Sequence, residues 1–482
     1  MPQRKRPVRS QVRKQRQKQP PSIPRTIRHA VYILIERYRT TGQLVRDQLL
    51  ELFLNDEIRP QAVAWSERLI LRQRTIDRVL KECVSRPVDQ VQASLWTILR
   101  MGANELLFGP ADSQHAAISE TVEICRLLTH PEWTGFVNGV LRGVQRLLTD
   151  QVTNEIAANA YPFENHEYRV LNKEIFPDLE AHFPSYMGFA FSLPEPLIRE
   201  WDRRYTREEF IELCWSTLEA PPMHVRLNRI AVEPAQWVER CREAEIAVST
   251  TDVPESIRID QKVRLSNLPG FEAGEFVVQD IAATHAAKLL NPYPGQRVLD
   301  LCAGPGTKTT QLAELMLDRG ELLATEVSPR RIEQIEENAK RLQISCIKTL
   351  LIDREDPYIS DEPFDAILID APCSNTAVLG KRAEARWRYS ITELHLLNDI
   401  QMQLLDTASE LLVEDGRMVY STCSIEPKEN EQLISRWLEN HPEFTCSEMK
   451  SILPNANRDG GFCALIERRE DSKEIENVDG MS

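Results

Sequence analysis

From about Gly274 onward, apolar runs of strand length alternate with helical stretches, and no other feature of the sequence restricts the fold as much. The strand candidates span residues 297–302, 321–327, 345–352, 364–369 and 417–421. Helical stretches at 307–317, 330–342, 392–412 and 427–440 separate most of them. This alternation predicts a Rossmann-like α/β domain at residues 276–470, with a mainly parallel sheet, helices on both faces and a ligand site at the carboxyl ends of the strands.

The first half of the chain lacks this alternation. Between residues 26 and 150, apolar side chains such as Leu95 and Ile98 recur at helical spacings, and prolines separate the runs, which predicts a small all-helical domain. Residues 151–275 mix helical segments with short apolar runs, which predicts a linker followed by a small α/β subdomain.

Charge and cysteine usage restrict the class of protein. The first 28 residues hold ten Lys or Arg and no acid, although the net charge of the chain is −14. Such an arm fits binding to phosphates and equally fits a solvated tail, so we expect a disordered basic tail at 1–25 and a flexible tail at 471–482. Scattered cysteines without a CxxC pair predict no metal site, and the absence of a leader or membrane span predicts a cytoplasmic protein with reduced thiols.

A glycine-rich turn between a strand and a helix is the first candidate for ligand binding. The run Val298-Leu-Asp-Leu-Cys-Ala-Gly-Pro-Gly-Thr-Lys308 follows neither the GxGxxG nor the GxxxxGK[ST] spacing, so it is not built for phosphates. Glu326 and Asp353 end the next two strands, where carboxylates can accept hydrogen bonds from ribose hydroxyls and an adenine amino group. An ordinary turn and ordinary strand-end acids remain the alternative. The combination favours S-adenosylmethionine, an adenosine ligand without phosphates.

Two cysteines follow two further strands. Asp370-Ala-Pro-Cys373 comes after the strand at 364–369, and Ser421-Thr-Cys423 ends the strand at 417–421. A single cysteine is most often an inert core residue, but two at strand ends favour covalent catalysis. C5 of cytosine is a poor nucleophile, and thiolate addition at C6 lets C5 attack a methyl sulfonium. The Asp370 carboxyl group can then hydrogen-bond or protonate N3 of the base.

The ordered motifs resemble those of RNA cytosine-C5 methyltransferases of the Nol/Nop/Sun family. They are Gln279-Asp280, Asp300-Leu-Cys-Ala-Gly-Pro-Gly-Thr-Lys308, Asp370-Ala-Pro-Cys-Ser374 and Ser421-Thr-Cys-Ser-Ile-Glu-Pro-Lys-Glu-Asn430. The resemblance implies a class I methyltransferase domain in which Cys423 is the nucleophile and Cys373 promotes product release. It also implies a set of residues around the cofactor S-adenosylmethionine: Cys302, Ala303, Gly304, Pro305, Gly306, Thr307, Lys308, Glu326, Asp353 and Asp370.

The helical domain adds a subfamily. Ile118-Ser-Glu-Thr-Val-Glu-Ile-Cys-Arg126 and Gly135-Phe-Val-Asn-Gly-Val-Leu-Arg142 are similar to the NusB RNA-binding domain. A NusB-like domain fused to this catalytic domain resembles the Sun-type bacterial 16S ribosomal RNA methyltransferases. The resemblance implies 16S ribosomal RNA as partner, free or in an early assembly particle, an RNA-binding role for the subdomain at 151–275, and a monomer without metal or membrane contact.

Some positions depart from the family pattern. Thr307 stands where a glycine is more common, and Ser374-Asn-Thr-Ala-Val378 replaces a Ser-Gly/Ala-Thr-Gly-Val segment. These changes affect the inferred RNA target more than the inferred reaction. A transfer RNA methyltransferase and a non-catalytic ribosome-assembly factor with the same fold therefore remain alternatives, whereas a DNA target would leave Cys423 without a role.

Overall fold

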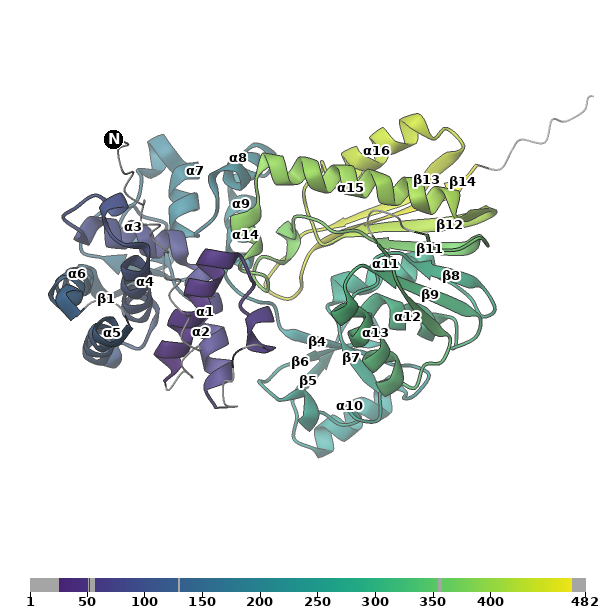
Figure 1. Cartoon of the computed structure of the whole chain (residues 1–482), viewed down its shortest axis with the longest axis horizontal. Coiled ribbons are helices and arrows are strands. Elements are labelled where there is room, and N and C mark those ends of the chain that lie inside the picture. The colour runs from purple at the N-terminus through teal and green to yellow at the C-terminus, as the bar shows by residue number, and fades with distance from the viewer. Residues whose placement is uncertain (1–25, 51, 53–56, 129–130, 354–357, 470–482) are drawn as a thin grey trace, which may run out of the picture. The chain divides into compact units, whose positions relative to one another are not determined.

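The computed structural model describes residues 26–50, 52, 57–128, 131–353 and 358–469 (Figure 1). The chain divides into two compact units, Met1–Leu69 with Val84–Gly143 and Ile70–Cys83 with Val144–Ser482. The tails predicted at 1–25 and 471–482 lie outside the described residues. Among those that are described, no helix has both the length and the apolar character needed to cross a bilayer.

The first unit is helical. Its central helix α4 buries most of its side chains, including Leu99 and Leu107, and contacts α1 and α5. Thr26 caps the start of α1, and Gly42 ends it in the left-handed conformation. The helical segments are α1 (Ile27–Thr41), η1 (Asp47–Leu50), α2 (Ile58–Leu71), η2 (Val88–Gln90), α4 (Ala93–Phe108), η3 (Ala111–Ser113), α5 (Gln114–Leu128), η4 (Pro131–Trp133) and α6 (Thr134–Leu147), of which α2 and α6 end in the second unit.

The second unit begins with helix α3 and a three-stranded antiparallel sheet of order β1-β3-β2. Helix α3 packs within this unit, where Arg74 N donates to Ser192 Oγ. Three helices then lead to the next sheet. The bounds are α3 (Gln73–Cys83), β1 (Leu148–Thr153), β2 (Ala160–Pro162), β3 (Tyr168–Leu171), α7 (Leu179–Ala190), α8 (Glu195–Arg204) and α9 (Arg207–Ser216). Strands β1 to β3 contain only short apolar runs; β2 and β3 lie in the segment predicted as a linker, and β1 begins at the end of the segment predicted as helical.

A small α/β subdomain follows, as the sequence predicts. Its four antiparallel strands have the order β5-β6-β4-β7. Trp237 of helix α10 packs against Phe276 of β7, with ring centroids 5.6 Å apart, and anchors the helix to the sheet. The elements are β4 (Met223–Leu227), α10 (Pro234–Glu243), β5 (Val248–Thr250), β6 (Ser256–Ile259), η5 (Leu265–Asn267) and β7 (Phe276–Val278).

The largest sheet has seven strands in the order β10-β9-β8-β11-β12-β14-β13, of which the first five are parallel and the last two antiparallel to their neighbours. The strands are β8 (Arg297–Asp300), β9 (Glu321–Glu326), β10 (Ile347–Leu351), β11 (Phe364–Asp370), β12 (Leu412–Thr422), β13 (Phe444–Ile452) and β14 (Gly461–Arg468). The helical segments are α11 (Ile281–Leu290), α12 (Thr307–Leu315), α13 (Pro329–Arg341), η6 (Thr376–Val378), α14 (Ala385–Arg388), α15 (Ile391–Glu410) and α16 (Glu431–Asn440).

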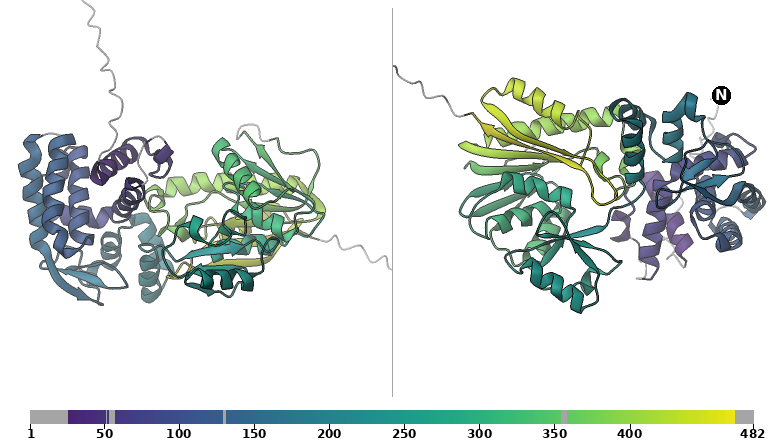
Figure 2. Two further views of the ribbon diagram at one scale, coloured as in Figure 1. Left: turned by 90° about the horizontal axis from the view of Figure 1, so that it is seen from below. Right: turned by 180° about the vertical axis from the view of Figure 1, so that it is seen from behind.

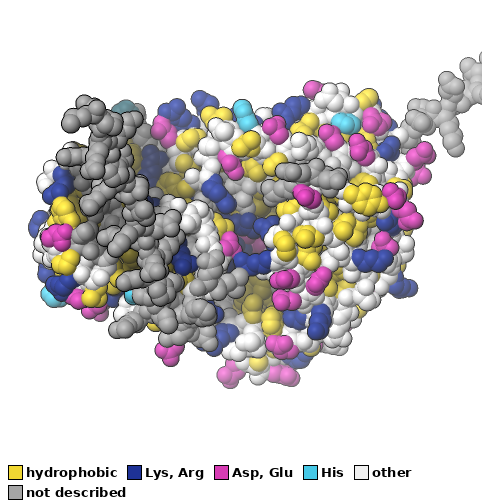
Figure 3. Space-filling view, viewed as in Figure 1, with side chains coloured by type: hydrophobic (Ala, Val, Ile, Leu, Met, Phe, Trp, Pro, Cys, Tyr) yellow, Lys and Arg dark blue, Asp and Glu magenta, His cyan; other side chains and the backbone are white. Residues whose placement is uncertain are grey.

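Basic and acidic side chains are interspersed on the surface that is visible in Figure 3. Figure 2 shows the second unit from two further sides, with helices on both faces of its seven-stranded sheet. Side chains of successive strand residues point to opposite faces of a sheet, so both faces of this one can be buried only if its strands are apolar throughout.

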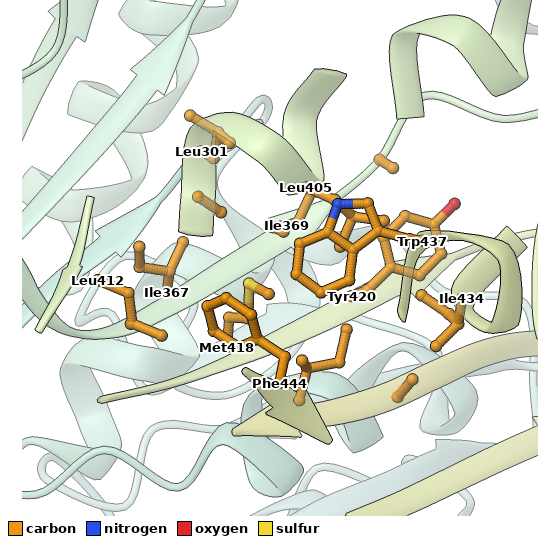
Figure 4. Close-up of a cluster of buried hydrophobic side chains, with 14 of the residues drawn as sticks. Leu301, Ile367, Ile369, Leu405, Leu412, Met418, Tyr420, Ile434, Trp437 and Phe444 are labelled. Atoms are coloured by element: carbon orange, nitrogen blue, oxygen red, sulfur yellow. The ribbon is translucent and has the colours of Figure 1, made fainter. Parts of the chain in front are cut away.

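The strands meet this requirement. Val298 and Leu368 face the side that α11 and α12 cover, whereas Leu299 and Ile367 face the side that α15 and α16 cover. On the second side, Trp437 of α16 lies in one cluster with Tyr420, Met418, Ile369 and Leu405 (Figure 4). The prediction of a mainly parallel sheet covered on both faces is therefore confirmed, and the antiparallel β13–β14 hairpin at its edge is an addition to it.

Candidate active site

The glycine-rich segment between β8 and α12 forms a loop at the carboxyl ends of β8, β9 and β11. Leu301 N donates to Leu368 O at 2.9 Å, and Ala303 N donates to Thr325 O at 3.0 Å, so the loop is tied to both neighbouring strands. Gly306 has φ +98°, a backbone conformation that residues with a side chain rarely adopt. The loop therefore needs its glycine at this position.

Gly304 has a different reason to be glycine. A Cβ built there would lie 2.3 Å from Glu326 Oε2, so the backbone passes directly beside this carboxylate. Glu326 is nearly buried at the end of β9, and its Oε1 accepts from the amides of Val327 and Ser328 at 2.8 and 3.1 Å. A carboxylate at this strand end is of the kind that accepts hydrogen bonds from the ribose hydroxyl groups of S-adenosylmethionine.

The other acids lie along the same edge. Asp353 follows β10 and is exposed, two residues beyond Leu351, which pairs with Glu326. Asp300 at the end of β8 is fully buried; its Oδ2 accepts from Thr309 Oγ1 at 2.7 Å, while its Oδ1 has no partner among the described residues. Burial, together with the charges of Asp370 and Glu326, raises the pKa of Asp300 to about 7. The residues present therefore fit the predicted cofactor.

Lys308 links the cofactor loop to the second part of the site. This first-turn residue of α12 extends to the end of β11, where its Nζ lies 2.6 Å from Asp370 Oδ1. Burial alone would lower the pKa of Lys308, but the Asp370 carboxylate outweighs it and raises the pKa. Asp370 is thus presented as a paired carboxylate with about a third of its side chain exposed.

The two predicted cysteines are in contact. Strands β11 and β12 are parallel neighbours, with Asp370 opposite Ser421, and each cysteine follows its strand end. The sulfur atoms of Cys373 and Cys423 are 3.2 Å apart. Both side chains are free thiols, and Cys423 is the more accessible of the two. Two positions 50 residues apart in the chain thus form one pair.

The surroundings shift the pKa values of the two thiols in opposite directions. The hydrogen bond from Cys373 lowers the pKa of Cys423; burial opposes this, and the nearby charge of Arg382 supports it. The same contact raises the pKa of Cys373 well above its ordinary value, with burial and the negative charge of Glu429 acting in the same direction. Cys423 is therefore the thiol that ionises first, as a nucleophile requires.

A buried carboxylate connects the two cysteine loops. Each cysteine is followed by a serine, and both serines donate to Glu429: Ser374 through its hydroxyl group and its amide (2.9 Å), and Ser424 through its hydroxyl group at 2.6 Å. Gln401 donates to the same carboxylate at 3.1 Å. Glu429 is fully buried, so the loops share one acceptor that water does not reach.

One of the departures from the family pattern has a local explanation. Asn375 adopts φ +61°, a left-handed conformation that asparagine tolerates better than most residues, so it can stand where glycine is usual. Its Nδ2 donates to Cys373 O at 2.7 Å, and its Oδ1 accepts from Arg382 at 2.9 Å and from Cys423 Sγ at 3.2 Å. Nothing in the structure explains Thr307, which begins α12 and whose backbone carbonyl oxygen accepts from Arg226.

The fold and this site define a class of protein. A parallel β10-β9-β8-β11-β12 core, a glycine loop after β8 and an acid at the end of β9 form a Rossmann-like methyltransferase domain that uses S-adenosylmethionine. Residues 287–462 match the family described as 16S rRNA methyltransferase RsmB/F, residues 26–146 match the NusB family, and residues 193–266 match the ferredoxin-like domain of RsmF/B-like methyltransferases. Residues 287–462 thus form a methyltransferase domain of the RsmB/F type, and residues 26–146 form a helical domain of the NusB type.

Known relatives cover most of the chain. Ribosomal RNA small subunit methyltransferase B of Yersinia pseudotuberculosis is 28% identical over 392 residues, which are 80% of this chain and 84% of the relative. The crystal structure of PH0851 has a TM-score of 0.71 and 25% identity, and covers 94% of this chain and 100% of that one. NSun6 from Pyrococcus horikoshii, solved with SFG, shares the fold, with a TM-score of 0.52 and 18% identity over 58% of this chain and 99% of that one.

The structure brings most of the predicted site residues together and adds others. Cys373, Cys423, Asp370 and Lys308 meet at the ends of β11 and β12, while Glu326 borders the cofactor loop. The contacts of Glu429 were not predicted. The available signal was the repetition of Cys-Ser at both strand ends, because a buried hydroxyl group requires a hydrogen-bond partner.

Proposed function

We propose that the protein transfers a methyl group from S-adenosylmethionine to C5 of a cytosine in 16S ribosomal RNA, through a covalent bond between Cys423 and C6. The observation that carries this proposal is the 3.2 Å separation of the Cys373 and Cys423 sulfur atoms beside Asp370. The substrate is inferred from the names of the Yersinia relatives and from the NusB-type domain. The assigned roles of the cofactor-loop residues are part of the same proposal.

Cys423 begins the reaction. Its thiolate adds to C6 of the cytosine, and the electrons of the C5–C6 double bond move so that C5 becomes nucleophilic. As negative charge develops on the ring, the Asp370 carboxyl group in its protonated form donates its proton to N3, and Lys308 holds the resulting carboxylate in place. S-adenosylmethionine supplies the methyl group as an electrophile. The cytosine must leave its stack to reach the thiol, as is usual for enzymes that act on bases.

Cys373 acts at the end of the reaction. After methylation, C5 carries both a methyl group and a hydrogen atom; this proton must leave to a base, and the bond between Cys423 Sγ and C6 must break. Cys373 stays protonated because its pKa is raised, so its thiol can donate a hydrogen bond to the departing Cys423 thiolate. Release of the product then regenerates both side chains.

A trapped adduct tests this division of roles. With Cys373→Ala, the expected product with 16S transcript and cofactor is a protein–RNA complex that survives denaturing electrophoresis. Cys423→Ala should form no such complex and should lose methyl transfer by at least about 1000-fold. An active Cys423→Ala enzyme, or no complex with Cys373→Ala, would contradict the assigned roles.

Bisulfite sequencing of total RNA identifies the substrate. Cells that lack the gene should lose one protected cytosine in 16S ribosomal RNA, and the intact gene should restore it while the Cys423→Ala gene should not. Loss of a protected cytosine in transfer RNA would show that the substrate is transfer RNA. No change in any RNA would favour a non-catalytic assembly factor.

A further inference from the structure

A small pocket of about 60 Å³ lies beside Cys423. Its lining includes Cys423 and Lys308 together with two acids, Asp280 and Asp459, whereas Asp370 is not among the lining residues.

The two acids flank Lys381. Its Nζ lies 3.0 Å from Asp280 Oδ2 and 2.7 Å from Asp459 Oδ2, and the Asp459 amide donates to Asp280 Oδ1 at 3.2 Å. Both acids are nearly buried, whereas a third of the Lys381 side chain is exposed. Behind them, the buried His224 has its Nδ1 3.9 Å from Asp280 Oδ2 and without a hydrogen-bond partner among the described residues.

The bonding within the target nucleotide indicates which of its parts lies in this pocket. Cys423 bonds to C6 of the cytosine, and C6 is bonded to N1, the atom that carries the ribose. N3, the atom assigned to Asp370, lies across the ring, and C5, the other neighbour of C6, faces the methyl donor. The lining contains neither Asp370 nor residues 302–307 of the cofactor loop, so the pocket fits the sugar side of the nucleotide.

The charged side chains of Asp280, Asp459 and Lys381 favour binding of a ribose over binding of a phosphate. Two carboxylates against one ammonium group make this part of the pocket unfavourable for an anion. A hydroxyl group donates and accepts at once, so it matches a pair in which Asp459 accepts and Lys381 donates. We propose that the Asp459–Lys381 pair is a ribose-binding subsite that hydrogen-bonds the 2′-hydroxyl group of the target nucleotide and thereby selects RNA over DNA.

The environment of Asp459 supports this assignment. Burial, followed by the charge of Asp280, raises the pKa of Asp459 to about 6, even though Lys381 donates to its carboxylate. A ribose hydroxyl group would supply a second donor to this carboxylate. The proposal rests on the proposed function, since it takes Cys423 as the nucleophile.

The test compares two short RNAs that contain the cytosine mapped by bisulfite sequencing, one all-ribose and one with a single 2′-deoxycytidine at that position. For the wild-type enzyme, kcat/KM should fall roughly 10- to 100-fold on the deoxy substrate, as expected for a lost hydrogen bond to a charged group. In Asp459→Ala and in Lys381→Met, this ratio should shrink to less than about 3-fold. Lys348→Met, which breaks an exposed ion pair with Glu321 at the opposite end of the sheet, should keep the wild-type ratio.

The outcomes separate the two proposals. Equal wild-type rates on both substrates, or an unchanged ratio in both pocket variants, would overturn the ribose subsite while leaving cytosine methylation intact. No methylation of either RNA by the wild-type enzyme would overturn the proposed function itself. If Asp459→Ala does not fold, as thermal unfolding would reveal, Lys381→Met decides alone, since it keeps most of the side-chain stem.

Discussion

At the scale of single residues, the neighbouring thiols of Cys373 and Cys423 differ in the pH at which they lose a proton. The contact between them lowers the pKa of Cys423 and raises that of Cys373, so the first proton to leave the pair comes from Cys423. Lys308 and Arg382 add positive charge on the side of Cys423, whereas Glu429 adds negative charge on the side of Cys373. The division between nucleophile and proton-bearing partner therefore follows from the placement of charged side chains.

Alkylation by iodoacetamide should report this difference. The thiolate is the reactive form, so the rate at Cys423 should rise with pH, with its midpoint below pH 9, where an ordinary thiol titrates. Cys373 should remain unmodified over the same range, because its pKa is raised. Peptide mass spectrometry distinguishes the sites, and preferential modification of Cys373 would reverse the assignment.

Glu429 should control the geometry of the Cys373–Cys423 pair rather than the binding of RNA. Glu429→Gln keeps the size of the side chain but replaces one acceptor oxygen with a donor, which cannot accept from Ser374 and Ser424. We expect kcat to fall by roughly 10- to 100-fold, as for a misplacement of about 1 Å, with KM for RNA unchanged. Glu443→Gln, an exposed acid beyond α16, is the matched control. A change confined to KM would argue against a positioning role.

At the scale of elements, the cofactor loop depends on how closely its backbone approaches β9. Strand β9 ends in Glu326 directly beside Gly304, so the loop and the strand end form one surface. The sheet determines this arrangement, because β8 and β9 pair in parallel and end at the same edge. A side chain on the loop would change that edge without altering the strands.

Gly304→Ala tests this dependence. The added methyl group would lie 2.3 Å from Glu326 Oε2 and would displace the carboxylate. Calorimetry should then show at least about 10-fold weaker binding of S-adenosylmethionine, or about 1.4 kcal/mol. Gly139→Ala in α6 is the control, because nothing lies within 4 Å of its added Cβ. Equal affinities would show that the close approach is irrelevant to the cofactor.

The elements also show what could be predicted from the sequence. Apolar runs and strand-end motifs predicted β8 to β12 and the positions of Cys373 and Cys423, because both depend on local pattern and on the parallel arrangement. The β13–β14 hairpin was missed because β13 is largely exposed at the sheet edge and lacks an apolar run. The role of Glu429 was missed because it depends on contacts with residues up to 55 positions away.

At the scale of the whole molecule, the sequence places strong positive charge outside the described residues. The body has interspersed charges in the view of Figure 3, whereas residues 1–28 carry ten Lys or Arg and no acid. Cations that neutralise phosphates release counterions, so we expect this segment to increase RNA affinity and its dependence on salt. The helical unit and the catalytic unit would then share RNA binding with the N-terminal segment.

Deletion of residues 1–25 should weaken binding to 16S transcript and reduce the slope of log affinity against log salt. Each lost phosphate contact should change this slope by about 0.7 to 0.9. Filter binding at several salt concentrations measures both effects, and a full-length variant with Gln in place of the Lys and Arg residues of 1–25 separates charge from length. An unchanged slope in both variants would indicate a segment without RNA contacts.

The carboxylate shared by Ser374 and Ser424 has a consequence for how this enzyme can diverge. Replacement of either serine alone leaves a buried anion short of a donor, which costs about 1–3 kcal/mol. Loss of the acid alone leaves two buried hydroxyl groups competing for fewer acceptors. Related chains should therefore change these three positions together or not at all, and a descendant that has abandoned methylation should be recognisable by their joint replacement.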